Sequence, residues 1–303
     1  VFAALGSDTG GSIRFPAACC GVTGIKPTLG RVPRTGTMPL CASLDTIGPL
    51  ARTARDCALV LAAIAGADAA DAQSDPRPVP DWMATIDAGG AGLTIGVIPG
   101  ALIEGLDTAI ASALAEAVAA WRQTGVRVVE LRPPDLVTAH ALAVTVLLAE
   151  AAATQGRWLD GREQDLTPVT ALSLRKGREI APADSADALA WRARCVEAFS
   201  AEVFTRCDAL LLPILPIPVP TLDETDWGAP ARGRLVAAMM RHTPAINFLG
   251  LPALALPSGF DAHGLPIGHQ IVGRPFEEGT LFRLGVAFQT VTDWHARRPP
   301  HPA

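Results

Sequence analysis

Tyrosine is absent from this sequence of 303 residues, and lysine is nearly so, since Lys26 and Lys176 are the only two among 25 basic residues. A mechanism with a tyrosine base has no candidate here, and one with a lysine base has two. Charged residues make up 18% of the sequence and apolar residues 49%, which excludes intrinsic disorder. With a net charge of −5, the sequence also lacks the basic excess of a nucleic-acid-binding protein.

Metal-binding cysteine pairs and long apolar runs are missing as well. None of the six cysteines forms a C-x-x-C pair, so the spacing of a zinc ribbon or a thioredoxin motif is absent. Six cysteines are too sparse for a disulfide scaffold, and we expect reduced thiols, no bound metal and a cytoplasmic location. The best apolar run, residues 141–148, is far shorter than the ~18 residues of a membrane span. We therefore expect no contact with a membrane.

The sequence begins with Val1 rather than methionine. Residues 1–5 form an apolar run that is typical of a buried strand already under way, and no leader-peptide pattern is found around them. We therefore expect a fragment of a longer chain that lacks the N-terminal part.

Strands and helices alternate along the sequence. Apolar runs bounded by turn residues predict strands at 1–5, 93–99, 126–131, 209–212, 253–257 and 267–273. Amphipathic spacing and capping residues predict helices at 53–65, 107–124, 135–158, 184–205 and 277–294. We expect mostly loop with short strands over 15–50, irregular structure over 159–183, and a parallel crossover over 93–131. The fold class that follows is α/β, with a mixed β-sheet sandwiched between helices.

A glycine-rich turn, Asp8-Thr9-Gly10-Gly11-Ser12, follows the first predicted strand. Successive N–H groups in such a turn form a nest for an anion, and the serine after them places a hydroxyl beside those donors. That arrangement suits an oxyanion hole with its nucleophile. The Walker, G-x-G-x-x-G and G-x-S-x-G patterns are all absent. On these residues alone, a structural turn and a catalytic turn are equally good alternatives.

Longer motifs around this turn resemble the amidase signature family, the Ser–cis-Ser–Lys amide hydrolases. The matching stretches are GSDTGGSIRFPA (6–17), CGVTGIKPTLGRV (20–32), SLDTIGPLARTARDCALVLAAIAG (43–66), CDALLLPILPIP (207–218), NFLGLPALALPSGF (247–260) and GLPIGHQIVG (264–273). Residues 67–205 carry no comparable motif. The resemblance implies that residues 1–303 are one amidase domain, the C-terminal portion of the amidase signature fold without its N-terminal part.

The resemblance also implies the roles of six residues. These are Ser12 as the catalytic nucleophile, Thr9, Gly10 and Gly11 as the backbone donors of the oxyanion hole, and Asp8 and Arg14 as residues that brace the loop, through a charge pair. The family's bridging cis-serine and its lysine base lie upstream of this motif, and neither is found in this sequence. We therefore expect residues 1–303 alone to be inactive.

The implied activity is hydrolysis of a carboxylic amide to an acid and an amine or ammonia through a serine acyl-enzyme. It needs no cofactor and takes a small-molecule amide, with no nucleic acid or membrane as partner; a homodimer is one open oligomeric state. One alternative is the A subunit of the tRNA-dependent (Asp/Glu) amidotransferase, although its NLARFDG-type and GFG-type stretches are missing from residues 130–190. A second alternative is a family member that keeps the fold but has no catalysis.

Four other polar residues receive plainer interpretations. We consider His242 and His269 as alternative bases for Ser12 and rank them well below the family's serine–lysine pair. Lys26 and Asp45 are expected to hold loops in place.

Overall fold

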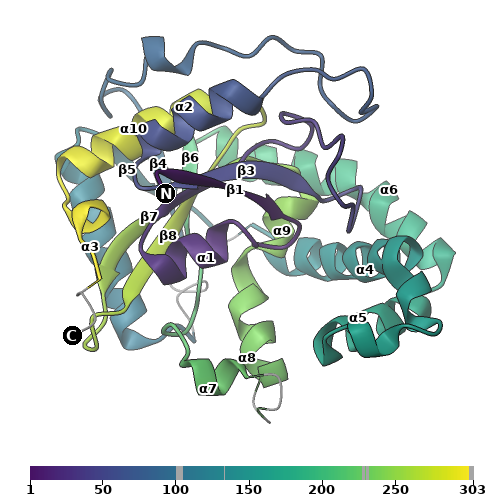
Figure 1. Cartoon of the computed structure of the whole chain (residues 1–303). Helices are drawn as coiled ribbons and strands as arrows, with labels where there is room; N and C mark the ends of the chain where they lie inside the picture. Colours follow the sequence, from purple (N-terminus) through teal and green to yellow (C-terminus); the bar gives the residue numbers. More distant parts are fainter. Residues whose placement is uncertain (100–104, 133, 227–228, 230–231, 300–303) are drawn as a thin grey trace.

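The computed structural model of the chain describes residues 1–99, 105–132, 134–226, 229 and 232–299 (Figure 1). Within these residues a single sheet contains β1 (Ala3–Asp8), β2 (Thr23–Lys26), β3 (Thr46–Ala51), β4 (Thr94–Val97), β5 (Arg127–Glu130), β6 (Ala209–Pro213), β7 (Ala253–Phe260) and β8 (Pro266–Gly273). The strands lie in the order β1-β3-β2-β7-β8-β6-β4-β5. Strand β4 runs parallel to β5 and β6, and all other neighbours are antiparallel.

Helices cover both faces of the sheet, as Figure 1 shows. The α-helices of the described residues are α1 (Arg14–Cys20), α2 (Ala54–Ile64), α3 (Thr108–Gln123), α4 (Leu136–Gln155), α5 (Pro168–Arg178), α6 (Pro182–Phe199), α7 (Leu222–Thr225), α8 (Arg232–Met239), α9 (Pro244–Phe248) and α10 (Glu278–Thr290). One hydrophobic core lies under α2, α3 and α10, and another under α4, α6 and α9. The predicted fold class, an α/β protein with a mixed sheet between helices, is confirmed.

The capping and spacing signals in the sequence located two helices well. Thr53 accepts a hydrogen bond from the Asp56 N–H and so caps α2, as a Ser/Thr N-cap does. In α3 the side chains of Ile110, Leu114 and Trp121 are buried on one face. Helix α3 joins the parallel strands β4 and β5, which confirms the predicted crossover.

Five α-helices of the described residues were not predicted, namely α1, α5, α7, α8 and α9, and one strand was misjudged. Residues 15–50 include α1, whose seven residues are too few to show a helical period, and residues 159–183 include α5, although Thr167 and Pro168 are typical start signals. The first strand is β1, which begins two residues and ends three residues later than predicted. It lies at the edge of the sheet with Leu5 exposed, so it is not the buried strand that its apolar run indicated.

The helical run Leu136–Leu159 is long and apolar enough to cross a membrane by length and composition alone, with a mean hydropathy of 1.8. The expectation that no segment reaches this limit was wrong, because Leu136, Val137 and alanines on both sides of residues 141–148 keep the mean hydropathy high despite His140 and Glu150. Ala139, Ala143 and Val146 of α4 lie in the second core, and α4 contacts α5, α6 and α9. Such contacts are typical of a core helix.

Candidate active site

The glycine-rich turn connects the end of β1 to the start of α1 and is called the 8–14 loop below. Ser12 is exposed, whereas the residues on both sides of it, Gly11 and Ile13, are buried. The loop therefore presents one serine to solvent from an otherwise buried turn. The six residues that the sequence singled out all lie in it.

The Asp8 carboxylate holds the backbone of the 8–14 loop in place. Its carboxylate accepts hydrogen bonds from the N–H groups of Gly11 at 2.7 Å and Ile13 at 3.2 Å. It also pairs with the Arg14 guanidinium at 3.0 Å, and both side chains are fully buried. Burial alone raises the pKa of Asp8, but the charge and hydrogen bonds of Arg14 outweigh it and lower the pKa to about 2. The predicted charge pair is confirmed.

Arg14 joins the loop to the C-terminal half of the chain. Its guanidinium donates to Gln270 Oε1 at 2.8 Å, to Asn247 Oδ1 at 2.5 Å and to the Thr243 carbonyl at 3.2 Å. Together with the bonds to Asp8, these contacts occupy all three nitrogens of the guanidinium. Because Arg14 is also fully buried, it is a structural centre of the loop and does not reach a substrate carboxylate from within the protein.

The carbonyl groups of Asp8 and Gly11 are held by hydrogen bonds, and this fixes where the N–H groups of the same peptides point. The Asp8 carbonyl accepts from Thr46 Oγ1 at 3.0 Å and from Asn247 Nδ2 at 2.9 Å, while the Gly11 carbonyl accepts from the Phe15 N–H at 2.7 Å. The peptide bonds of the described residues are trans, so each N–H points opposite to the carbonyl of the same peptide. The next N–H groups, those of Thr9 and Ser12, therefore point away from these partners.

Three N–H groups of the loop, those of Thr9, Gly10 and Ser12, have no hydrogen-bond acceptor within the part of the chain that the structure describes. These are free donors of the kind that an oxyanion hole uses. The Gly11 N–H, by contrast, is committed to Asp8. The sequence missed the Ser12 N–H, although the N–H groups at a helix start are commonly unpaired and α1 begins two residues later.

Gly11 is required by its conformation and by its neighbours. Its φ is +131°, and a Cβ at this position would lie 2.5 Å from Phe15 Cζ and from Thr243 Oγ1. The Thr243 hydroxyl also donates to the Gly10 carbonyl at 2.6 Å. The second glycine thus lets Thr243 and Phe15 approach the loop closely.

No base for Ser12 is found among the described residues, because the Ser12 hydroxyl has no hydrogen-bond partner there. Burial, with the charges of Arg241 and His140 adding to it, lowers the pKa of His242 to about 4. Burial lowers the pKa of His269 to about 3, and Trp121 Nε1 donates to its ring at 3.4 Å. Neither histidine makes a hydrogen bond to Ser12.

The two lysines do not contact the serine either. Lys26 is fully buried, and its Nζ donates to the Pro27 carbonyl at 2.8 Å, which agrees with its expected role in holding a loop. Burial, followed by the charge of Arg14, lowers the pKa of Lys26 to about 7. Lys176 lies on an exposed position of α5.

Apolar side chains flank the loop at Gly10. Met240 Cε and Leu147 Cδ1 lie 3.2 Å and 3.5 Å from the position that a Cβ on Gly10 would take. Met240 belongs to the short 3₁₀ turn η5 (Met240–His242), and Leu147 belongs to α4. Both side chains are half-buried, so they offer an apolar surface beside the free donors.

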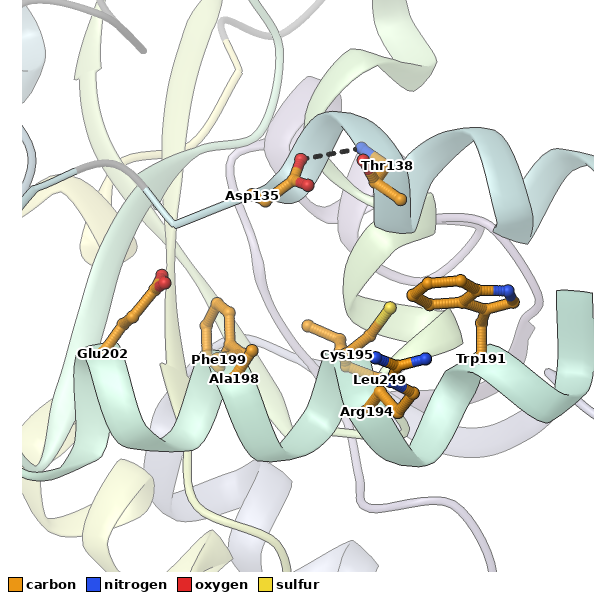
Figure 2. A pocket seen from close by; sticks show the side chains of 9 residues that line it. All are labelled: Asp135, Thr138, Trp191, Arg194, Cys195, Ala198, Phe199, Glu202 and Leu249. Atoms are coloured by element: carbon orange, nitrogen blue, oxygen red, sulfur yellow. Dashed lines mark hydrogen bonds between the residues drawn. The ribbon is translucent and has the colours of Figure 1, made fainter.

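A separate cavity of about 280 Å³ lies between α6 and the start of α4, and Figure 2 shows its lining. Asp135 uses its carboxylate to accept from the Thr138 N–H, and Arg194 stacks on Trp191 with 4.4 Å between the guanidinium carbon and the ring centroid. Burial raises the pKa of the Cys195 thiol. No residue of the 8–14 loop lines this cavity, so it is not part of the serine site.

Comparisons with known proteins show the family of the chain. A family model described as Amidase matches residues 1–282. The A subunit of Glutamyl-tRNA(Gln) amidotransferase from Roseiflexus sp. (strain RS-1) is 39% identical over 328 residues, which cover 99% of this chain and 65% of the relative. The solved structure of the Thermotoga maritima protein of the same name superposes with a TM-score of 0.79 at 32% identity, over 96% of this chain and 62% of that one.

A second solved structure belongs to a vestigial protein complex studied for the origins of an s-triazine catabolic enzyme. It superposes with a TM-score of 0.85 at 32% identity, over 96% of this chain and 63% of that one. The chain thus spans slightly less than two thirds of the length of these relatives. The family match extends over most of the chain and includes the complete 8–14 loop, and this chain therefore belongs to the amidase family.

Proposed function

We propose that the intact protein hydrolyses a carboxylic amide through an acyl-enzyme on Ser12. The observation that carries this proposal is the exposed serine beside the free N–H groups of Thr9, Gly10 and Ser12, on a loop held from below by Asp8 and Arg14. Donors that are fixed before the substrate arrives stabilise the oxyanion without reorganisation. The family resemblance supports the same assignment.

The proposed reaction has two steps. Ser12 Oγ loses its proton and attacks the amide carbon, and the free N–H groups bind the oxyanion of the tetrahedral intermediate; the C–N bond then breaks, and the amine leaves with a proton. Water next attacks the ester, which releases the acid and returns a proton to Ser12. We assign proton transfer to the family's serine–lysine pair, because none of the described residues makes a hydrogen bond to the Ser12 hydroxyl.

The apolar side chains beside Gly10 indicate which class of substrate fits the site. Leu147 and Met240 are the side chains nearest to Gly10 on the side where a Cβ would lie, and neither can pair with a charge. We therefore propose a small neutral amide with an aliphatic or aryl acyl group. A homodimer and a cytoplasmic location remain proposals of the same kind, and size-exclusion chromatography of the intact protein tests the first.

The test is to express the intact protein and its Ser12→Ala variant. The wild type is expected to turn over simple aliphatic or aryl amides and to react with a fluorophosphonate at Ser12 alone. The variant is expected to lose labelling and at least about 10⁴-fold in kcat, as removal of a catalytic nucleophile does. Its melting temperature should change by only a few degrees, since the side chain is exposed and small. Labelling of a different serine would refute the assignment.

A second candidate function is that of the first relative named above, one component of the Glutamyl-tRNA(Gln) amidotransferase. Identity of 39% over nearly the whole chain favours it, whereas the apolar flank at Gly10 favours a free-standing amidase. One assay distinguishes the two candidate functions. Turnover of simple amides by the purified protein without partners supports the free-standing enzyme, and activity only with companion subunits and charged tRNA supports the amidotransferase.

A further inference from the structure

Thr9 is anchored by one side-chain contact. Its hydroxyl donates to Asp45 Oδ1 at 2.6 Å, and both side chains are buried. Neither the N–H nor the carbonyl of Thr9 has a hydrogen-bond partner within the described residues. The bond to Asp45 is therefore the only hydrogen bond, in that part of the chain, that fixes the residue whose N–H is a free donor of the 8–14 loop.

The Asp45 carboxylate is itself held in place through its second oxygen. Its second carboxylate oxygen, Oδ2, accepts from the N–H groups of Leu40 and Cys41, both at 2.9 Å. The Asp45 N–H donates back to the Cys41 carbonyl at 2.8 Å. These bonds close residues 40–45 into a tight turn around the carboxylate, so the Asp45 oxygen that meets Thr9 has a fixed position.

The turn of residues 40–45 is also tied to α4 and to a neighbouring loop. Glu150 Oε2 on α4 accepts from the Ser43 N–H at 2.9 Å, and Arg34 Nη1 donates to the Ala42 carbonyl at 2.6 Å. Glu150 lies one helical turn beyond Leu147, the residue that flanks Gly10. The helix that borders the loop thus also holds the turn that positions Thr9.

We infer that Asp45 is a positioning residue for amide hydrolysis, acting through the Thr9 hydroxyl to aim the Thr9 N–H at the oxyanion; this inference rests on the proposed function. Asp45 touches no reacting atom in this role. An N–H donor that is displaced by a fraction of an ångström stabilises the transition state much less, whereas substrate binding is less sensitive to such a displacement. Loss of the bond should therefore appear in kcat more than in KM.

A matched pair elsewhere separates positioning from general stability. Thr28 Oγ1 donates to Glu278 Oε1 at 2.6 Å, and both side chains are buried. The two Thr–carboxylate bonds have the same length and similar burial, but the second has no hydrogen bond to the 8–14 loop. Thr28→Val thus removes the same kind of bond, and with it the bond that Thr28 Oγ1 accepts from the Phe276 N–H at 2.8 Å, so it is at least as severe a structural change as Thr9→Val.

The experiment compares kcat, KM and melting temperature of the intact wild type with those of Thr9→Val, Thr9→Ser and Thr28→Val. Thr9→Val is expected to lower kcat about 10- to 100-fold and to change KM by less than about threefold, as removal of an outer-shell partner does. Thr9→Ser keeps the hydroxyl and should restore most of the lost kcat. Thr28→Val should lower the melting temperature at least as much as Thr9→Val and leave kcat within about twofold.

Asp45→Asn enters the experiment only as a double variant, because its amide N–H would meet the N–H groups of Leu40 and Cys41. Added to Thr9→Val, it should lower kcat no further, since Asp45 acts on the oxyanion donor through the Thr9 hydroxyl, which is already gone, whereas loss of the bonds to Leu40 and Cys41 should appear in the melting temperature. Unchanged kcat in Thr9→Val, or an equal loss in Thr28→Val, would overturn the inference and leave the proposed function standing. A wild type that neither hydrolyses amides nor is labelled at Ser12 would overturn both.

Discussion

Replacement of Lys26 by methionine should stabilise the protein, and the gain should depend on pH. The Lys26 side chain is fully buried in β2 and its Nζ has a single hydrogen-bond acceptor, the Pro27 carbonyl. Burial is the main cause of its lowered pKa; the charges of Arg14 and Arg192 lower it further, and those of Asp8 and Glu278 raise it. Methionine keeps most of the aliphatic stem and removes the charge.

The magnitude follows from the pKa. The shift from 10.5 in the unfolded chain to about 7 in the folded one corresponds to about 5 kcal/mol, at about 1.4 kcal/mol per pH unit. Loss of the hydrogen bond to the Pro27 carbonyl offsets about 1 kcal/mol of this gain. Partial relaxation around a buried charge reduces it further, so we expect Lys26→Met to raise the free energy of unfolding by about 1–4 kcal/mol at pH 7.

The sign of the pH dependence is fixed by the same values. Between pH 7 and about 10.5 the unfolded chain binds the Lys26 proton and the folded chain does not, so wild-type stability from this group rises with pH. The advantage of Lys26→Met should therefore be largest below pH 7 and shrink towards pH 10. Urea unfolding of both proteins at pH 6, 8 and 9.5 measures it. A difference that stays constant over this range, or a variant less stable than wild type, would refute the reasoning.

Three further perturbations have expected outcomes. Gly11→Ala should lower the free energy of unfolding by at least about 2 kcal/mol and abolish fluorophosphonate labelling of Ser12, because the new Cβ would lie 2.5 Å from Phe15 and Thr243 at a φ of +131°. An unchanged urea midpoint would contradict this. Asp8→Asn should lower stability by about 3–5 kcal/mol, since it leaves the buried Arg14 charge without its partner. Because the pKa of Asp8 is about 2, the stability it contributes is present above pH 3.8 and is lost as pH falls towards 2, so the variant should show a smaller loss of stability than wild type over that acid range. Thr53→Ala should lower stability by about 1 kcal/mol through loss of the α2 cap, without effect on labelling, which a thermal melt and a labelling assay check together.

The sequence predicted most of the sheet but not the whole of the site. Capping residues and amphipathic spacing located α2 and α3, because those signals are local. Helix α1 escaped because seven residues give too little periodicity. The charge pair of Asp8 and Arg14 could be expected from the motif, whereas the bonds from Arg14 to Asn247 and Gln270 could not, because they depend on how the chain closes in space.

The N–H donors of the 8–14 loop could likewise be predicted only in part from the sequence. A run of glycines indicates that backbone N–H groups can point at an anion, but not which of them do so. Asp8 takes the Gly11 N–H, and the start of α1 leaves that of Ser12 free. Which N–H groups are paired and which are free depends on carboxylate and carbonyl positions that no local pattern specifies.

The partners of Arg14 also bear on the order in which the protein is built. Arg14 and Gln270 are 256 residues apart in the sequence, and Arg14 and Asn247 are 233 apart. The signature motif is synthesised before α9 and the β7–β8 hairpin, so the contacts of Arg14 with these segments cannot form until they have followed. Contacts of such separation form late in folding. A nascent chain therefore carries Ser12 on a loop without these contacts until α9 and the β7–β8 hairpin have been made, and this delays any reactivity to that point.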